Sequence, residues 1–303
     1  MRGGLSNLKT EAQEEKQWAA TSSALAAFAL TGLKLVIGVL TGSLGILAEA
    51  AHSGLDFVAA GITAFAVRKS DKPADPEHPY GHWKVENLSA FVEAILLLVT
   101  CFWILYTAVQ RILSGNIGIE VNAWSFGVVI LSIAIDVSRS RMLYRAARKF
   151  NSQALEADAL HFSTDIWSSG VVLLGLLCVK LHEWLNAYAF LHYADTVAAI
   201  MVALIVIQVS AKLGMRTINA LMDSAPPGAE EKVIAAVHAL PDILDCHKIR
   251  IRSIGHKCFV DLHVRINGDL TLREAHDVTI DIERAIRTVL PGCDITVHPE
   301  PNQ

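Results

Sequence analysis

The sequence predicts an α-helical membrane bundle of six transmembrane helices, followed by a small cytosolic α+β domain. Of the 303 residues, 52% are hydrophobic and only 18% are charged, whereas soluble domains carry about a quarter charged residues. Apolar stretches long enough to cross about 30 Å of hydrocarbon recur before residue 214. After residue 228 the pattern changes, and helical and strand periodicities follow one another. The chain therefore divides into a membrane part and a soluble part.

Six apolar stretches are each read as one membrane-spanning helix, since about 20 helical residues cross the hydrocarbon. The predicted spans are Trp18–Leu40, Leu44–Val67, Leu88–Ile112, Ala123–Val137, Leu160–Leu181 and Ala189–Leu213. The fourth is short because it ends beside Asp136. Residues 1–17 are polar, mixed in charge and without the apolar core of a signal peptide, so we predict a cytosolic tail before a membrane domain of residues 18–213.

Lysine and arginine residues flank these spans unequally. One side carries Arg2, Lys9, Lys16, Arg68, Lys69, Lys72, Lys84, Arg139, Arg141, Arg145, Arg148, Lys149, Lys212 and Arg216, and the other carries Arg111 and Lys180. Basic residues gather on the cytosolic side of membrane helices, so both termini are predicted to be cytosolic. The short loops without a His-rich tract favour a bacterial inner (plasma) membrane.

The last quarter of the chain reads as a separate domain. Residues 214–228 are a predicted linker that ends in the breaker cluster Ser-Ala-Pro-Pro-Gly. In the predicted domain, residues 229–303, periodicity indicates helix Ala229–Leu240, strands Ile249–Ile254 and Cys258–Ile266, helix Leu272–Leu290 and strand Asp294–Val297. This αββαβ order predicts a sandwich with the helices on one face of the sheet.

Charge and cysteine usage exclude other classes. The net charge is −4, and no basic cluster with interleaved aromatic residues is present, which argues against a nucleic-acid partner. The five cysteines are odd in number and lack CxxC spacing. We therefore predict neither a disulfide framework nor a cysteine zinc finger.

Two histidine–aspartate pairs lie within predicted spans: His52 with Asp56, and His161 with Asp165. A separation of four residues puts both side chains of a pair on one helix face. Ionisable groups in mid-membrane cost several kcal/mol unless they are paired or ligated. Each pair alone is also compatible with a structural hydrogen bond. Their recurrence favours one shared site of two imidazoles and two carboxylates, the complement of tetrahedral zinc.

These two HxxxD pairs, the six-span layout, the segment GSLGILAE at 42–49 and the αββαβ domain resemble the cation diffusion facilitator family, from about Trp18 to Pro301. The resemblance implies a ferredoxin-like, metallochaperone-like cytosolic domain and a homodimeric secondary transporter, not an enzyme. It implies export of a divalent metal in exchange for protons by alternating access. His52 resembles members that favour zinc; cadmium, cobalt, iron and manganese are the alternative ions.

The resemblance also carries further roles onto this sequence. The loop residues Asp75, His78 and His82 match a DxxHxxxH metal site. A cytosolic binuclear zinc site is implied at His247, His263, His276, His298 and Glu300, with Glu300 where members usually have Asp. Lys84 and Asp223 match a charge interlock at the dimer interface. A solvated loop, plain surface histidines and a surface ion pair are the respective alternatives.

Two other functions remain open from sequence alone. A membrane sensor or scaffold would bind metal without moving it, although it has little reason to keep four ionisable ligands in mid-membrane. An intramembrane metalloenzyme could use His and Asp ligands, but no HExxH motif is present. Glu49, one turn before His52, is a candidate supporting acid or proton relay.

Overall fold

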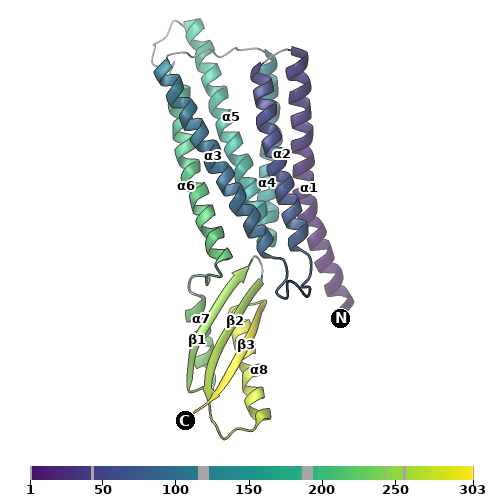
Figure 1. The fold of residues 1–303 in the computed structure, drawn as a ribbon, viewed down its shortest axis with the longest axis vertical. Coiled ribbons are helices and arrows are strands. Elements are labelled where there is room, and N and C mark those ends of the chain that lie inside the picture. The colour runs from purple at the N-terminus through teal and green to yellow at the C-terminus, as the bar shows by residue number, and fades with distance from the viewer. Residues whose placement is uncertain are drawn as a thin grey trace. The chain divides into compact units, whose positions relative to one another are not determined.

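The computed structural model divides the chain into two compact units, residues 1–217 and residues 218–303. Figure 1 draws both. The structure describes residues 2–41, 44–114, 123–185, 194–241, 243–254 and 257–302.

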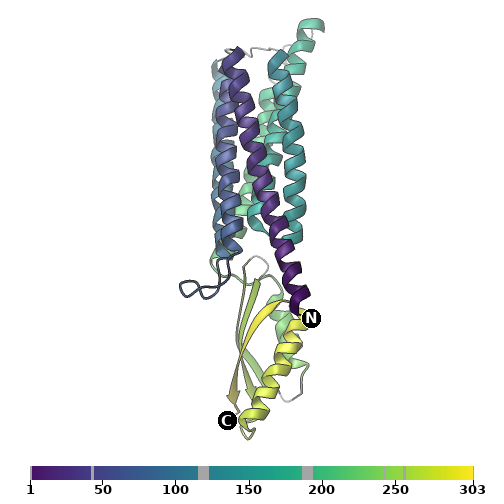
Figure 2. The same cartoon turned by 90° about the vertical axis from the view of Figure 1, so that its right-hand side faces the viewer.

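Long helices that run side by side make up the first unit (Figures 1 and 2). They are α1 (Arg2–Thr41), α2 (Leu44–Ser70), α3 (Lys84–Ser114), α4 (Ala123–Phe150), α5 (Gln153–Leu185) and α6 (Ala194–Leu221). Helix α1 packs along α2 and α4, and α5 contacts α2, α3 and α4. The contact between α2 and α5 is the one that a shared His–Asp site requires.

Small side chains line the contacts between these helices. Ala19 and Ala20 of α1, Ala60 of α2 and Ala159 of α5 are each at most 3% exposed. In a bilayer, small residues let helix backbones approach closely, because burial of apolar surface does not itself drive helices together. Large apolar side chains point outward instead, as Leu25 does at 68% exposure. The outer surface of the bundle therefore suits lipid.

Four helices of the described part of the chain are long and apolar enough to cross a membrane. They are Gln13–Leu40, Ala50–Ser70, Lys84–Gln110 and Ile200–Leu221. These segments coincide with the first, second, third and sixth predicted spans. The prediction of a helical membrane domain is confirmed, whereas six crossings go beyond this finding.

Two helices of this unit run past the predicted spans. Residues 2–17, the predicted cytosolic tail, are the first turns of α1, because a polar segment without breakers can continue a helix. Helix α4 continues beyond the predicted fourth span to Phe150. The charged residues that follow that span therefore belong to the same helix.

The second unit has the predicted αββαβ order. It contains α7 (Ala229–His238), β1 (Asp245–Ile254), β2 (Lys257–Ile266), α8 (Leu272–Val289) and β3 (Cys293–Pro301). The sheet order is β1-β2-β3, with β1 antiparallel and β3 parallel to β2. Both helices cover one face of the sheet (Figure 2). Val237, Val260, Leu262, Ile282 and Ile286 form its core and are at most 1% exposed.

A disulfide joins Cys258 of β2 to Cys293 of β3. The two residues face each other in the parallel register, with their Cα atoms 4.4 Å apart. The number and spacing of the cysteines predict no disulfide framework, and they do not indicate this single bond. Cys258 and Cys293 are separated by 35 positions in the sequence, and they become neighbours only because their strands pair.

Candidate metal sites

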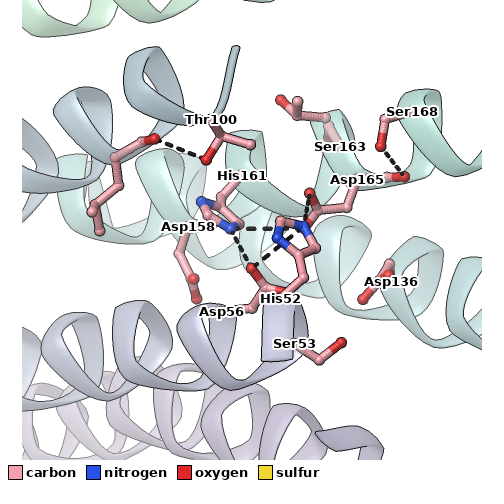
Figure 3. Close-up of polar contacts among 12 residues, drawn as sticks. His52, Ser53, Asp56, Thr100, Asp136, Asp158, His161, Ser163, Asp165 and Ser168 are labelled. Carbon is pink, nitrogen blue, oxygen red and sulfur yellow. Dashed lines mark hydrogen bonds and ion pairs between the residues drawn. The ribbon is translucent and has the colours of Figure 1, made fainter. Parts of the chain in front are cut away.

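Four side chains converge between α2 and α5 (Figure 3). The Nε2 atom of His161 lies 3.0 Å from Oδ1 of Asp56 and 3.7 Å from Oδ2 of Asp165. The Nε2 atom of His52 lies 4.0 Å from Oδ1 of Asp56 and 3.7 Å from Oδ1 of Asp165. The structure thus brings together the four residues of the predicted intramembrane site.

Hydrogen bonds between neighbouring helices hold α2 and α5 around this cluster. The hydroxyl of Thr31 donates to the backbone carbonyl of Ser53, and Nζ of Lys34 donates to Oγ of Ser53, both at 2.8 Å. These bonds tie α1 to the turn of α2 beside the first histidine. On the other side, Oγ of Ser140 in α4 lies 2.8 Å from Oγ of Ser163 in α5. The cluster is therefore supported from both flanking helices.

The composition of this cluster suits a divalent cation. With neutral imidazoles the two carboxylates carry a charge of −2, which one dication balances. Asp56 and His161 are 8% and 5% exposed, so an unbalanced charge there would be costly. Two nitrogen and two oxygen ligands match tetrahedral zinc better than magnesium or calcium, which prefer oxygen ligands alone.

The cavity beside these ligands contains further charged groups, among them an ion pair, Asp136 with Arg139, that the sequence analysis does not predict. Lys34, Asp136 and Arg139 line it together with His52, Asp56 and Asp165. Asp136 is 7% and Arg139 4% exposed. Asp136 and Arg139 are three residues apart in the sequence, a separation that places two side chains on one helix face. That spacing is the signal from which the pair could have been predicted. Acid and base at that spacing inside an apolar stretch indicate a buried ion pair.

The three loop residues Asp75, His78 and His82 also lie together. Oδ1 of Asp75 accepts the backbone N–H of His78 at 2.7 Å, a hydrogen bond that holds the pKa of Asp75 below its ordinary value. Oδ2 of Asp75 lies 3.4 Å from Nε2 of His82, and the imidazole centroids are 4.5 Å apart. His82 is 4% exposed, and its ring nitrogens make no hydrogen bond to any described residue. A cation bound among the three side chains would give the ring nitrogens of His82 a partner.

Three histidines occupy neighbouring strand positions in the second unit. His247, His263 and His298 are register partners across β1, β2 and β3. Successive side chains of a strand point to opposite faces. Because Leu262 and Val264 are buried under the helices, His263 lies on the face that α7 and α8 leave open. Three histidines of the predicted cytosolic cluster thus occupy adjacent positions of the sheet.

Glu300 joins two of these histidines. Its Oε1 accepts a hydrogen bond from Nδ1 of His263 at 2.7 Å, which holds the pKa of Glu300 below its ordinary value. Its Oε2 lies 3.2 Å from Nε2 of His247, whose Nδ1 lies 3.1 Å from Asp245. A β-bulge follows His247, with Lys248 at φ 52°, and such bulges re-aim side chains. A glutamate in place of aspartate therefore still reaches both imidazoles.

The remaining predicted residues lie elsewhere. His276 is exposed on α8, across the sheet from the open face, so one chain does not bring it into the cluster. Lys84 begins α3 in the first unit, whereas Asp223 belongs to the second, where its carboxylate lies 3.9 Å from Arg252. Their interlock stays a prediction. The backbone of Glu49 belongs to α2, but its side chain lies outside the described residues.

Replacing Glu300 with glutamine is expected to weaken zinc binding at the cytosolic cluster by at least about 10-fold, because the variant loses the carboxylate that bridges two imidazoles. Since the pKa of Glu300 is lowered, the wild-type carboxylate is charged at pH 7 and loses that charge only as the pH falls through the lowered pKa. Equilibrium dialysis of the full chain against buffered zinc would count the ions retained. Glu283→Gln, on α8, is the control, and equal retention by all three proteins would contradict the assignment.

Known proteins resemble the chain over nearly its whole length. The cation efflux transmembrane domain family matches residues 20–222, and the cation efflux protein cytoplasmic domain family matches residues 225–302. A protein named Uncharacterized transporter from Synechocystis sp. is 34% identical over 281 residues, which is 91% of this chain and 87% of that protein. The cation-efflux pump FieF of Yersinia enterocolitica is 31% identical over 287 residues, 92% of each chain.

One solved structure in the comparison is the metal-bound C-terminal domain of the CzcD transporter from Thermotoga maritima. It is 26% identical and covers 24% of this chain and 86% of that domain, with a TM-score of 0.23.

Proposed function

The chain belongs to the cation efflux family, also called the cation diffusion facilitator family, and on that premise we propose that it exports zinc from the cytosol in exchange for protons. Family membership makes it a membrane transporter of divalent metal cations rather than an enzyme. The identity of the ion, the exchange for protons, the six crossings and a homodimeric assembly are parts of the proposal.

One observation carries the proposal: two imidazoles and two carboxylates from α2 and α5 meet in one cluster, in which Asp56 and His161 are buried. A helix pair that only needed hydrogen bonds would not require two acids and two bases at one point of a bilayer. A transported dication does require them, since its hydration shell must be replaced inside the membrane. The donor set favours zinc, with cadmium, cobalt, iron and manganese as weaker candidates.

Proton exchange follows from the same ligands. A metal binds imidazole and carboxylate only in their deprotonated forms. Free histidine titrates near pH 6.5, so protons and metal compete for these groups close to physiological pH. In the cytosol-facing state His52 and His161 bind zinc, and in the outward-facing state protons displace it. The protonated site then returns, and no separate proton carrier is needed.

The cytosolic cluster suits a regulatory role. Zinc bound by His247, His263 and Glu300 would occupy the open face of the sheet, where a second copy of the domain can pack. His276, which one chain keeps apart from the cluster, would contribute only from that second copy. Cytosolic zinc would then stabilise the dimer and bias the helices toward one arrangement. This role requires both termini in the cytosol of a cell whose inner membrane holds the protein.

Zinc uptake into proteoliposomes with an imposed pH gradient tests the proposal. We expect flux that needs an inwardly acidic gradient, that is faster for zinc than for manganese, and that stops when the gradient is collapsed by an ionophore. The control is the same vesicles without protein. Saturable zinc binding without any flux would instead identify a membrane sensor, and flux indifferent to the gradient would contradict the exchange.

A further inference from the structure

The cavity beside the four ligands contains an ion pair that the proposed transport cycle does not use. Asp136 and Arg139 come from α4 and line the cavity with Asp56 and Asp165. Figure 3 draws Asp136 next to the four-residue cluster. A fixed positive charge beside a dication site repels the dication. The charge of Arg139 therefore opposes metal binding, and its presence in the cavity calls for another role.

Arg139 is held in place by three helices. Its Nε and Nη2 atoms donate to Oγ of Ser23 in α1 at 3.3 and 3.1 Å. Its guanidinium lies over the ring of Phe162 in α5, 3.5 Å from the centroid. Its Nη1 atom donates to Oδ1 of Asp136 at 3.4 Å. Because arginine stays charged in proteins, this anchored side chain supplies a permanent positive charge.

Asp136 lines the same cavity as the proposed metal ligands His52, Asp56 and Asp165. Its Oδ1 atom is the one in contact with Arg139. A third carboxylate would turn the set of two nitrogens and two oxygens into an oxygen-rich set. Oxygen-rich sets with higher coordination numbers suit manganese, magnesium and calcium rather than zinc.

We propose that Arg139 holds Asp136 out of the coordination shell of the transported metal and thereby sets the preference for zinc over harder, oxygen-preferring cations. The inference rests on the proposed function, because it assigns a specificity-determining role beside the same transport site. Without the guanidinium, the side chain of Asp136 can turn toward the cluster. The cavity then gains one net negative charge and one oxygen ligand.

These two consequences are separable. The added negative charge strengthens the binding of every dication, whereas the added oxygen ligand favours manganese more than zinc. The ratio of the manganese KM to the zinc KM for transport therefore depends on which ligand atoms bind the metal. The effect of charge is common to both metals and cancels in this ratio. A role of Arg139 in packing alone would change stability or the maximal rate and leave this ratio unchanged.

The test compares zinc and manganese flux in proteoliposomes for the wild type and three variants. Arg139→Gln keeps an amide that can donate to Ser23 and removes the charge; we expect it to lower the ratio of the manganese KM to the zinc KM by at least about 10-fold. The double variant Asp136→Asn/Arg139→Gln is expected to return the ratio to within about 3-fold of the wild type, because the freed carboxylate is gone. Asp136→Asn alone should leave the ratio within about 3-fold of the wild type, because the lost charge affects both metals alike.

The KM ratios of the variants can overturn the inference in two ways. An unchanged ratio in Arg139→Gln, or a shift that persists in the double variant, overturns the inference. If Arg139→Gln does not fold, Asp136→Asn still decides, because a change of its KM ratio of about 10-fold or more would make Asp136 a ligand in the wild type. A wild-type protein that moves no zinc would refute the proposed function itself, which the ratio does not test.

Discussion

Zinc flux is expected to fall at least about 100-fold when Asp165 is replaced by asparagine. Changing a group that merely supports a metal ligand already costs about 10- to 100-fold in affinity, and Asp165 is itself a proposed ligand. Asparagine keeps the size of the side chain but removes its charge, so the dication would face one carboxylate instead of two. Asp165 also lies 3.7 Å from each of the two imidazoles, so the change reaches both ligand pairs.

The measurement is the initial rate of zinc uptake at equal protein density in proteoliposomes with an acidic lumen. Asp281→Asn is a matched control: it makes the same change to an exposed carboxylate on α8, in the second unit, and should retain flux. Gel filtration and thermal denaturation in detergent would show that both variants are folded. Zinc flux at the wild-type rate in Asp165→Asn would remove this cluster from the transport path.

The spacing of the sequence predicts how His and Asp lie within each helix, but not how the two helices meet. An i,i+4 separation places His52 over Asp56 on any regular helix, and the same holds for His161 and Asp165. That α2 meets α5, however, is a tertiary fact, and only the repetition of the motif hinted at it. The contact itself depends on small residues such as Ala60 and Ala159 at helix interfaces, whose pairing no local pattern specifies.

Charge inside α4 shows where sequence reasoning fails. A single acid after an apolar run resembles the end of a span, so the sequence alone places Asp136 at a boundary. In the folded chain its partner Arg139, the hydroxyl of Ser23 and the ring of Phe162 compensate the cost of burial. Two of those partners come from other helices. The sequence of α4 alone therefore does not show that these charged residues are buried.

The cytosolic domain repeats this division between local and non-local information. Alternation predicted β2 and the open-face position of His263, because the period of a strand is local. The pairing of β2 with β3 brings Cys258 against Cys293 and His263 against His298, and it follows from a crossover through α8. A histidine on that crossover, His276, is assigned to the cluster by resemblance alone.

Replacing Lys16 with methionine is expected to destabilise the membrane domain by about 3–5 kcal/mol, the usual cost of breaking a buried ion pair. Lys16 donates to Oε1 of Glu86 and to Oδ1 of Asp71, the latter at 3.2 Å, and is 4% exposed. Glu86 also accepts hydrogen bonds from Ser70 and Ser152. Without the ammonium, two carboxylates at the ends of α2 and α3 remain in a buried place with no cation.

Equilibrium unfolding by denaturant in detergent micelles measures this loss, and Lys149→Met is the matched control. Lys149 makes the same kind of ion pair with Glu15, but the two side chains are 57% and 53% exposed, so its removal should cost no more than about 1 kcal/mol. The double variant Lys16→Met/Glu86→Gln should regain part of the loss, because one of the stranded charges is gone. Equal stabilities of Lys16→Met and Lys149→Met would show that water reaches the Lys16 network, and the ends of α1, α2 and α3 would then owe their packing to apolar contacts instead.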